Sequence, residues 1–286
     1  MTAALFLPDL LWEPLITTAL REDFGTGGDV TTQALLGHQK TLRAVFRARH
    51  HGVLAGLPGA RLAFHALDGA THFTPLMAEG STIKPGDALA TVEGSAAAIL
   101  GGERVALNLL SHLSGIASTT AAIVHAVEGT GVDVCCTRKT LPGLRAVQKY
   151  AVRAGGGSNH RHRLDDAIML KDNHIALLGG TIKEALKAAR ERAGHLMKIE
   201  LEVDALEQLE EALSCGGADA YLLDNMEPDQ LRRAVSMING RAIAEASGGI
   251  TPDTARSKAE TGVDVLSLGW LTHSVTALDI GLDIDA

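Results

Sequence analysis

The sequence is poor in aromatic residues and in cysteine, and it has no excess of positive charge. Phe, Trp and Tyr make up 3% of the 286 residues while 46% are hydrophobic, so mainly aliphatic side chains must fill a core. The three cysteines show no C-x-x-C spacing, which argues against a disulfide-stapled secreted domain and favours the reducing cytoplasm. A net charge of −8 excludes a general nucleic-acid binder, and the hydrophobic content excludes a disordered tail.

Signals for targeting or membrane insertion are also lacking. The first residues contain no basic segment, and Pro8 and Asp9 interrupt the apolar run there, so we expect no signal peptide. No run approaches the ~18 apolar residues that a membrane-spanning helix needs. The sequence therefore predicts a cytoplasmic protein without a membrane segment.

The charge that is present is distributed unevenly. Residues 137–171 carry a net charge of +6, which leaves −14 for the remainder. Cations in a cleft need an anionic partner, and the acidic residues of this stretch are too few, so we expect an anionic substrate. The basic residues are Arg138, Lys139, Arg145, Lys149, Arg153, Arg161, Arg163 and Lys171. Among them, Arg145, Lys149 and Arg153 have helical spacing and are predicted to form the solvated face of a helix.

Beyond about residue 130, short apolar runs alternate with stretches of helical periodicity. From Ile199 onward the centres of these runs recur about every 22 residues, which is enough for one strand, one helix and two loops. The alternation predicts a parallel sheet that closes, or nearly closes, into a barrel. Six or seven recognisable strands fall short of eight, so an incomplete barrel is expected. The expected strands are 132–136, 167–170, 198–203, 220–223, 241–246 and 263–268.

Start signals support the helices between these strands. Residues 181–184 and 204–207 have the spacing of a capping box. Pro228 and Pro252 stand where the first turn of a helix is expected. Both signals predict helices that follow directly on the strand ends.

The first 100 residues show a different pattern. Residues 41–49 and 72–77 are predicted as strands, and residues 80–94 as turns between short antiparallel strands. Apolar residues at helical spacing predict a helix over 103–127 that joins the two parts. The sequence thus predicts an α/β protein, with an N-terminal α+β domain followed by a parallel α/β barrel.

Polar residues and glycines leave the carboxyl ends of the predicted strands, where the chemistry of parallel barrels lies. The guanidinium of Arg suits a carboxylate or phosphate, and Lys is a movable point charge. Two carboxylates on neighbouring strands suit Mg²⁺, and glycines before a helix leave N–H groups free for a phosphate. We therefore expect a phosphorylated substrate, a metal and a second anion. In strand order the residues are Arg138, Lys139, Lys171, Glu202, Asp224, Ser247, Gly248, Gly249 and Gly269.

Several sequence blocks are specific enough to indicate a family. The strongest are 137–145 (TRKTLPGLR), 155–161 (GGGSNHR) and 170–174 (LKDNH), and weaker ones are GDVTT at 28–32, ERVALN at 103–108, LDN at 223–225, EASGGI at 245–250 and LTHS at 271–274. With these blocks the chain resembles the quinolinate phosphoribosyltransferases, or decarboxylating nicotinate-nucleotide pyrophosphorylases, over nearly its whole length. The resemblance implies an α/β sandwich domain of residues 1–110, joined by 276–286, and a roughly seven-stranded barrel domain of residues 111–275.

The resemblance also implies an activity and an assembly. The enzyme would be a pentosyltransferase of NAD biosynthesis that moves phosphoribose from 5-phosphoribosyl-1-pyrophosphate to the ring nitrogen of quinolinate. Nicotinate mononucleotide, pyrophosphate and CO₂ would be the products, and Mg²⁺ would accompany the pyrophosphate substrate. Family members are homodimers, or assemblies of dimers, whose sites take residues from the partner.

Residue by residue, the resemblance assigns roles to matching positions. Arg104 would reach the substrate carboxylates from the neighbouring subunit, and Glu202 and Asp224 would bind the ribose hydroxyls and Mg²⁺. The catalytic set would be Lys139, Lys171, Glu202 and Asp224. The rest of the quinolinate pocket would comprise Thr137, Arg138, Lys139, His160, Arg161 and Lys171. The 5-phosphate would be held by Ser247, Gly248, Gly249, Leu268, Gly269 and Trp270.

Departures from the family pattern leave alternatives open. Cys136 stands where the family usually has Asp, the pair His162 and Arg163 replaces an apolar residue and Gly, and Trp270 replaces a small residue. A homologue associated with molybdate transport would share the fold but use another acceptor. A barrel aldolase would use Lys171 as a Schiff-base amine, and a non-catalytic relative would retain only phosphate binding.

Overall fold

The computed structural model describes residues 5–36 and 40–284, and the chain divides into two compact units. The first unit comprises residues 1–121, 140–156 and 270–286, and the second comprises 122–139 and 157–269. The chain thus passes repeatedly from one unit to the other. The domain boundaries expected from the sequence, at residues 110 and 275, stay a prediction.

The first unit contains an antiparallel sheet in the order β13–β1–β5–β3. Its strands are β1 (Thr41–Ala48), β3 (His72–Pro75), β5 (Ala88–Ser95) and β13 (Ile280–Ile284), and a separate pair is formed by β2 (Gly52–Val53) and β4 (Thr82–Ile83). The last strand of the chain therefore lies beside the first one, with Ala44 opposite Ile284. The predicted sheet of short antiparallel strands is confirmed.

Six helices belong wholly or largely to this unit: α1 (Asp9–Phe24), α2 (Val30–Leu35), α3 (Leu57–His65), α4 (Ala96–Ala126), α5 (Arg145–Ala154) and α11 (Trp270–His273). The indole of Trp12 on α1 packs edge-on against Tyr150 of α5, with ring centroids 5.4 Å apart. The predicted solvated face of α5 is correct for Arg153, which is exposed, but wrong for Lys149, which is 0% exposed. The reason is that α5 packs against both α1 and α11.

The long helix α4 corrects a second expectation. Among the described residues it is the one helix whose length and composition would allow it to cross a membrane, so the sequence-based exclusion was too strict. The aliphatic residues and alanines of the helix raise its mean hydropathy, whereas Gly, Ser and the polar residues between them prevent a continuous apolar run. Of its most apolar window 56% is buried within the protein, and Leu113 and Ile116 are fully buried. A helix that packs in the interior of a protein has the same properties, so α4 is weak evidence for a membrane segment.

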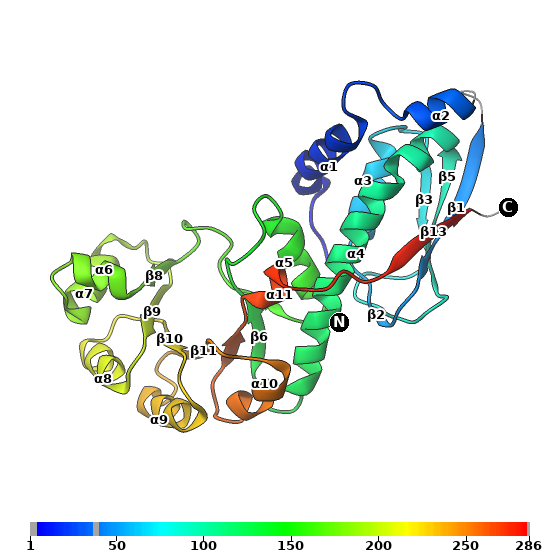
Figure 1. The fold of residues 1–286 in the computed structure, drawn as a ribbon. Coiled ribbons are helices and arrows are strands. Elements are labelled where there is room, and N and C mark those ends of the chain that lie inside the picture. The colour runs from blue at the N-terminus through cyan, green and yellow to red at the C-terminus, as the bar shows by residue number, and fades with distance from the viewer. Residues whose placement is uncertain (1–4, 37–39, 285–286) are drawn as a thin grey trace. The chain divides into compact units, whose positions relative to one another are not determined.

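The second unit is built on seven parallel strands in the order β7–β6–β12–β11–β10–β9–β8. The strands are β6 (Asp133–Cys136), β7 (Ser158–Asn159), β8 (Ile168–Leu170), β9 (Ile199–Val203), β10 (Ala220–Asp224), β11 (Ile243–Ser247) and β12 (Val265–Ser267). Although β7 and β8 are consecutive in the chain, they form the two edges, so the curled sheet does not close (Figure 1). The expected incomplete barrel is confirmed, with β7 as a strand that the sequence reading missed.

Five helices follow these strands: α6 (Asp172–Leu177), α7 (Ile182–Arg192), α8 (Leu206–Cys215), α9 (Pro228–Ile238) and α10 (Pro252–Ala259). Pro228 and Pro252 begin their helices as predicted, and the hydroxyl of Thr181 accepts the N–H of Glu184 at 3.3 Å. The helix predicted from the capping-box spacing at 204–207 is present, but its N-cap is Ala205 and not Asp204. The helix begins at Leu206, because the Gln208 side chain caps the N–H groups of the two preceding residues.

Candidate active site

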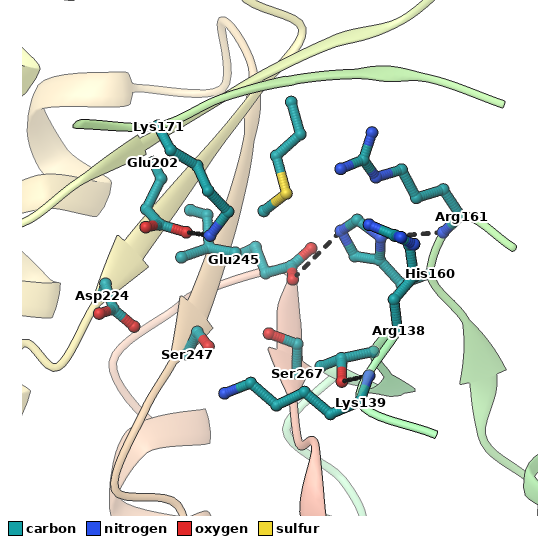
Figure 2. A pocket seen from close by; sticks show the side chains of 13 residues that line it. Arg138, Lys139, His160, Arg161, Lys171, Glu202, Asp224, Glu245, Ser247 and Ser267 are labelled. Atoms are coloured by element: carbon teal, nitrogen blue, oxygen red, sulfur yellow. Dashed lines mark hydrogen bonds and ion pairs between the residues drawn. The ribbon is translucent and has the colours of Figure 1, made fainter. Parts of the chain in front are cut away.

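A cavity of about 370 Å³ lies at the carboxyl ends of the strands of the second unit (Figure 2). Its walls come from the loops that leave the strands and from the last inward-facing residues of the strands themselves. It is lined by Thr137, Arg138, Lys139, His160, Arg161, Met169, Lys171, Glu202, Leu222, Asp224, Glu245, Ser247 and Ser267. The structure therefore brings nine of the residues singled out in the sequence to one cavity.

One side of the cavity is cationic. Arg138 follows β6, Arg161 follows β7, and Nη1 of Arg161 donates to the carbonyl of Ala167 at 2.7 Å. The Nε atoms of both arginines are buried without a hydrogen-bond partner in the part of the chain that the structure describes. Burial, and then the charge of Arg138, lower the pKa of the Arg161 guanidinium. Since a buried N–H without an acceptor is costly, this side is suited to an anion.

The opposite side carries two carboxylates on neighbouring strands. Glu202 lies on β9 and accepts a hydrogen bond from the ammonium of Lys171. Asp224 ends β10, one residue beyond the pairing of Leu223 with Val203, and its Oδ2 accepts from the side chain of Asn225 at 2.8 Å. Both carboxylates face the cavity (Figure 2). Hard oxygen donors in this arrangement fit Mg²⁺ bound together with substrate oxygens.

Three titratable groups lie together between these sides. Nδ1 of His160 accepts the backbone N–H of Arg161 at 2.9 Å, so its ring proton is on Nε2, which donates to Oε2 of Glu200 at 2.9 Å. The same nitrogen lies 3.7 Å from Oε1 of Glu245. The three groups are close enough to share a proton or to bind a metal ion. Burial, and then the charge of Glu200, raise the pKa of Glu245 to about 7.

Glu200 and Glu245 are functional candidates that the sequence reasoning missed. It considered only the residue that leaves each strand, whereas side chains two positions earlier point to the same face. Glu200 therefore shares the inward face of β9 with Glu202, and Glu245 shares that of β11 with Ser247. The alternation of Ile, Glu, Leu, Glu and Val over β9 carried this signal, because a strand inside a barrel should have no solvent-facing polar side.

The loop after β11 has the features of a phosphate site. Gly248 and Gly249 adopt φ angles of 84° and 61°, and a Cβ on Gly248 would lie 2.1 Å from Oδ1 of Asn225. Across residues 5–36 and 40–284, the N–H groups of both glycines donate to no protein acceptor. At the neighbouring strand end, a Cβ on Gly269 would lie 2.7 Å from Cδ of Lys139. Backbone can approach a ligand closely here because side chains are absent.

Other predicted residues lie outside the cavity lining. Arg104 is exposed on α4 and Trp270 begins α11, both in the first unit. Leu268 is buried and its N–H donates to the carbonyl of Cys135 at 2.9 Å. The roles that the resemblance gives to these residues stay predictions.

The unusual Cys136 has a structural partner. Its buried thiol donates to Oδ1 of Asn159 at 3.2 Å, which links the ends of β6 and β7. Asn159 directly precedes His160. The thiol therefore lies where it helps to fix the backbone that presents His160 and Arg161 to the cavity.

Comparison with protein families gives matches along most of the chain. The family described as "Quinolinate phosphoribosyl transferase, C-terminal domain" matches residues 116–283, and the corresponding N-terminal domain family matches residues 29–114. The two matches meet inside α4. Together they span both units and all residues that line the cavity.

Individual relatives are similar over nearly their full length. A probable nicotinate-nucleotide pyrophosphorylase (carboxylating) of Bacillus subtilis is 45% identical over 92% of this chain and 90% of its own. The human nicotinate-nucleotide pyrophosphorylase (carboxylating) is 39% identical over 99% of this chain and 95% of its own. Among solved structures, NadC from Streptococcus pyogenes superposes with a TM-score of 0.92 at 40% identity, covering 98% of this chain and 99% of its own.

Proposed function

The chain belongs to the quinolinate phosphoribosyltransferase family, and from that premise we propose how its cavity carries out the family's reaction. The enzyme transfers phosphoribose from 5-phosphoribosyl-1-pyrophosphate to the ring nitrogen of quinolinate, with release of pyrophosphate and CO₂, and forms nicotinate mononucleotide for NAD biosynthesis. The observation that carries this assignment is that two half-buried arginines face two carboxylates across one cavity, and that the buried Nε atoms of both arginines lack a hydrogen-bond partner within the described residues.

Quinolinate occupies the cationic side. Its two carboxylates accept hydrogen bonds from Arg138 and Arg161, whose buried Nε atoms lack acceptors within the described residues. Thr137, Lys139 and His160 complete the lining there. A dianion held by planar guanidinium groups has one orientation, and this orientation directs the ring nitrogen toward the acidic side.

Phosphoribosyl pyrophosphate occupies the acidic side. Glu202 and Asp224 lie where they would bind the ribose hydroxyls and Mg²⁺, since both offer carboxylate oxygens to the cavity. Mg²⁺ held by these two residues would neutralise charge on the leaving pyrophosphate. The N–H groups of the Gly248–Gly249 turn hold the 5-phosphate, as glycine-rich turns before helices do. Lys171, paired with Glu202, lies between the two substrates.

These positions account for the chemistry. As pyrophosphate leaves, positive charge develops at C1 of the ribose, and the carboxylates of Glu202 and Asp224 stabilise it. The ribosylated ring is then a pyridinium, and as CO₂ departs the electron pair of the C2–carboxylate bond stays on C2, where the adjacent positive nitrogen stabilises it. Carbon 2 then takes up a proton to give nicotinate mononucleotide. The protein contributes mainly position and charge.

A homodimer in the cytoplasm is part of this proposal. Arg104 is exposed, as a residue offered to a neighbouring subunit must be. The first unit also exposes large apolar side chains on α1 and α2, which are suited to contact with a second subunit. These side chains are Leu10, Leu11, Val30 and Leu35.

The activity assay is direct. Purified protein with Mg²⁺ and both substrates should release CO₂ and form nicotinate mononucleotide, and chelation of Mg²⁺ should suppress turnover. Turnover with nicotinate but not with quinolinate would refute the acceptor assignment. Mixing the inactive Arg104→Ala and Lys171→Ala subunits tests the shared site, because random pairing restores about a quarter of the native sites if Arg104 acts across the dimer.

A further inference from the structure

Lys258 on α10 is a buried cation outside the cavity lining. It is 6% exposed, and its Nζ donates to the carbonyl of Gly248 at 3.0 Å and to that of Met226 at 3.2 Å. A buried ammonium is costly unless it is paired. Within the described residues its hydrogen-bond acceptors are two backbone carbonyls rather than a carboxylate, so its charge is not cancelled by a hydrogen-bonded anion.

The two carbonyls belong to the two loops that carry the phosphoribosyl side of the cavity. Met226 lies in the loop after β10, two residues beyond Asp224, and Gly248 lies in the loop after β11. The loop after β10 also contacts the end of β11 directly, because the N–H of Asn225 donates to the carbonyl of Ser247 at 2.9 Å. The ammonium of Lys258 therefore joins the loop that follows Asp224 to the glycine turn.

The hydrogen bond from Lys258 to the Gly248 carbonyl also determines the direction of the Gly249 N–H. The described chain has no cis peptide bond, and in a trans peptide the C=O and the following N–H point in opposite directions. When the Gly248 carbonyl points to Lys258, the Gly249 N–H points away from Lys258 and is free for a ligand. Nζ lies 4.0 Å from the position that a Cβ on Gly249 would take, so the positive charge lies directly behind that donor.

We propose that Lys258 is the positioning residue of the phosphate site: it orients the Gly248–Gly249 peptide and fixes its distance from Asp224, and so sets the affinity for the phosphate end of a phosphoribosyl substrate. This inference rests on the proposed function for the identity of the substrate. Lys258 itself does not reach the cavity, so its effect passes through backbone groups.

The test compares Lys258→Met with Lys258→Arg. The methionine keeps the volume but leaves two carbonyls without a donor, and should raise KM for phosphoribosyl pyrophosphate about tenfold or more while KM for quinolinate changes less than about twofold. Binding of ribose 5-phosphate, measured by calorimetry, should weaken in parallel. The arginine, which can donate to both carbonyls, should recover part of the loss. Ala255→Gly, a buried change on the same helix, is the control for lost stability.

The outcomes separate this inference from the proposed function. If Lys258→Met lowers the melting temperature as Ala255→Gly does, but leaves KM for phosphoribosyl pyrophosphate and ribose 5-phosphate binding unchanged, Lys258 is only structural and the inference is overturned. Equal rises in both KM values, or no ribose 5-phosphate binding by the unaltered chain, also overturn it. If the unaltered chain binds ribose 5-phosphate and Lys258→Met does not, the inference holds even where quinolinate is not turned over.

Discussion

The two sides of the cavity are suited to anions in different ways. On the side proposed to hold quinolinate, long side chains bring charge into the cavity, and the buried Nε atoms of Arg138 and Arg161 have no acceptor within the described chain. On the side proposed to hold the phosphate, the donors would be backbone N–H groups at Gly248 and Gly249, and the buried cation Lys258 stands behind them. Anion binding on the first side depends on the side chains of the arginines. Anion binding on the second side depends on the lack of side chains at the glycines.

The largest effects are expected on the side-chain side. Arg138→Ala and Lys171→Ala should each lower kcat/KM by about a thousandfold or more, since each removes a charge that the substrates would contact in a desolvated site. Circular dichroism and thermal melting should show a folded protein. Arg153→Ala is the matched control, because this arginine is exposed on α5 and should change kcat/KM less than about twofold. Similar losses in all three variants would contradict the division of the basic stretch.

A smaller effect on the kinetics is expected from a methyl group added to the glycine turn. In Gly248→Ala, the Cβ would lie 2.1 Å from Oδ1 of Asn225 at a φ of 84°, so the turn must move and its N–H groups with it. We expect KM for phosphoribosyl pyrophosphate to rise about a hundredfold. Gly240→Ala has the same kind of backbone, with a φ of 68°, but open space around the Cβ. It should cost stability and leave both KM values unchanged. A comparable rise of KM in both variants would show that backbone strain alone is responsible.

The smallest expected effect concerns the acid pair between the two sides. The pKa of Glu245 is raised from 4.5 to about 7, so between these pH values the folded chain holds a proton that the unfolded chain has lost. Binding of this proton by the folded chain stabilises it. The stabilisation is fully present below about pH 4.5 and is lost as the pH rises through 7. Glu245→Gln removes this dependence, and its stability relative to the unaltered chain should rise from pH 4.5 to 8 by at most on the order of 3 kcal/mol.

Denaturant unfolding at several pH values measures this difference. Glu79, whose pKa is also raised by burial, is present in both proteins and cancels in the comparison. Glu207→Gln, an exposed change on α8, serves as the surface control. Parallel stability curves for the unaltered chain and Glu245→Gln would mean that Glu245 is not the group that holds this proton.

Local patterns predicted the barrel well. The period of strand and helix, together with proline at the first turn, identified six of the seven parallel strands and the starts of α9 and α10. The two-residue strand β7 has no apolar run of its own. Its position is determined by the glycines that precede it and by its pairing with β6. A strand defined by its neighbour rather than by its side chains has no signal in a single sequence.

The misplaced residues have a common physical cause. Lys149 follows a helical spacing that normally indicates a solvated face, but α5 is packed on more than one side and buries it. Glu200 and Glu245 are buried acids, and composition rules place acids at the surface. In each instance the environment is set by elements distant in the chain. The charges that leave the strand ends were correctly placed at the cavity because that location follows from parallel topology alone.

The pairing of β13 with β1 has a consequence for biosynthesis. The residues that complete the first sheet, such as Ile284 opposite Ala44, are synthesised after every other strand of that sheet. Until then β1 has one unpaired edge, and an exposed edge invites pairing with other chains. Contacts between such distant residues also slow folding. A nascent chain of this protein must therefore wait for β13 before the first sheet is complete. We expect aggregation during that interval, rather than loss of catalysis, to be the main effect of deleting β13.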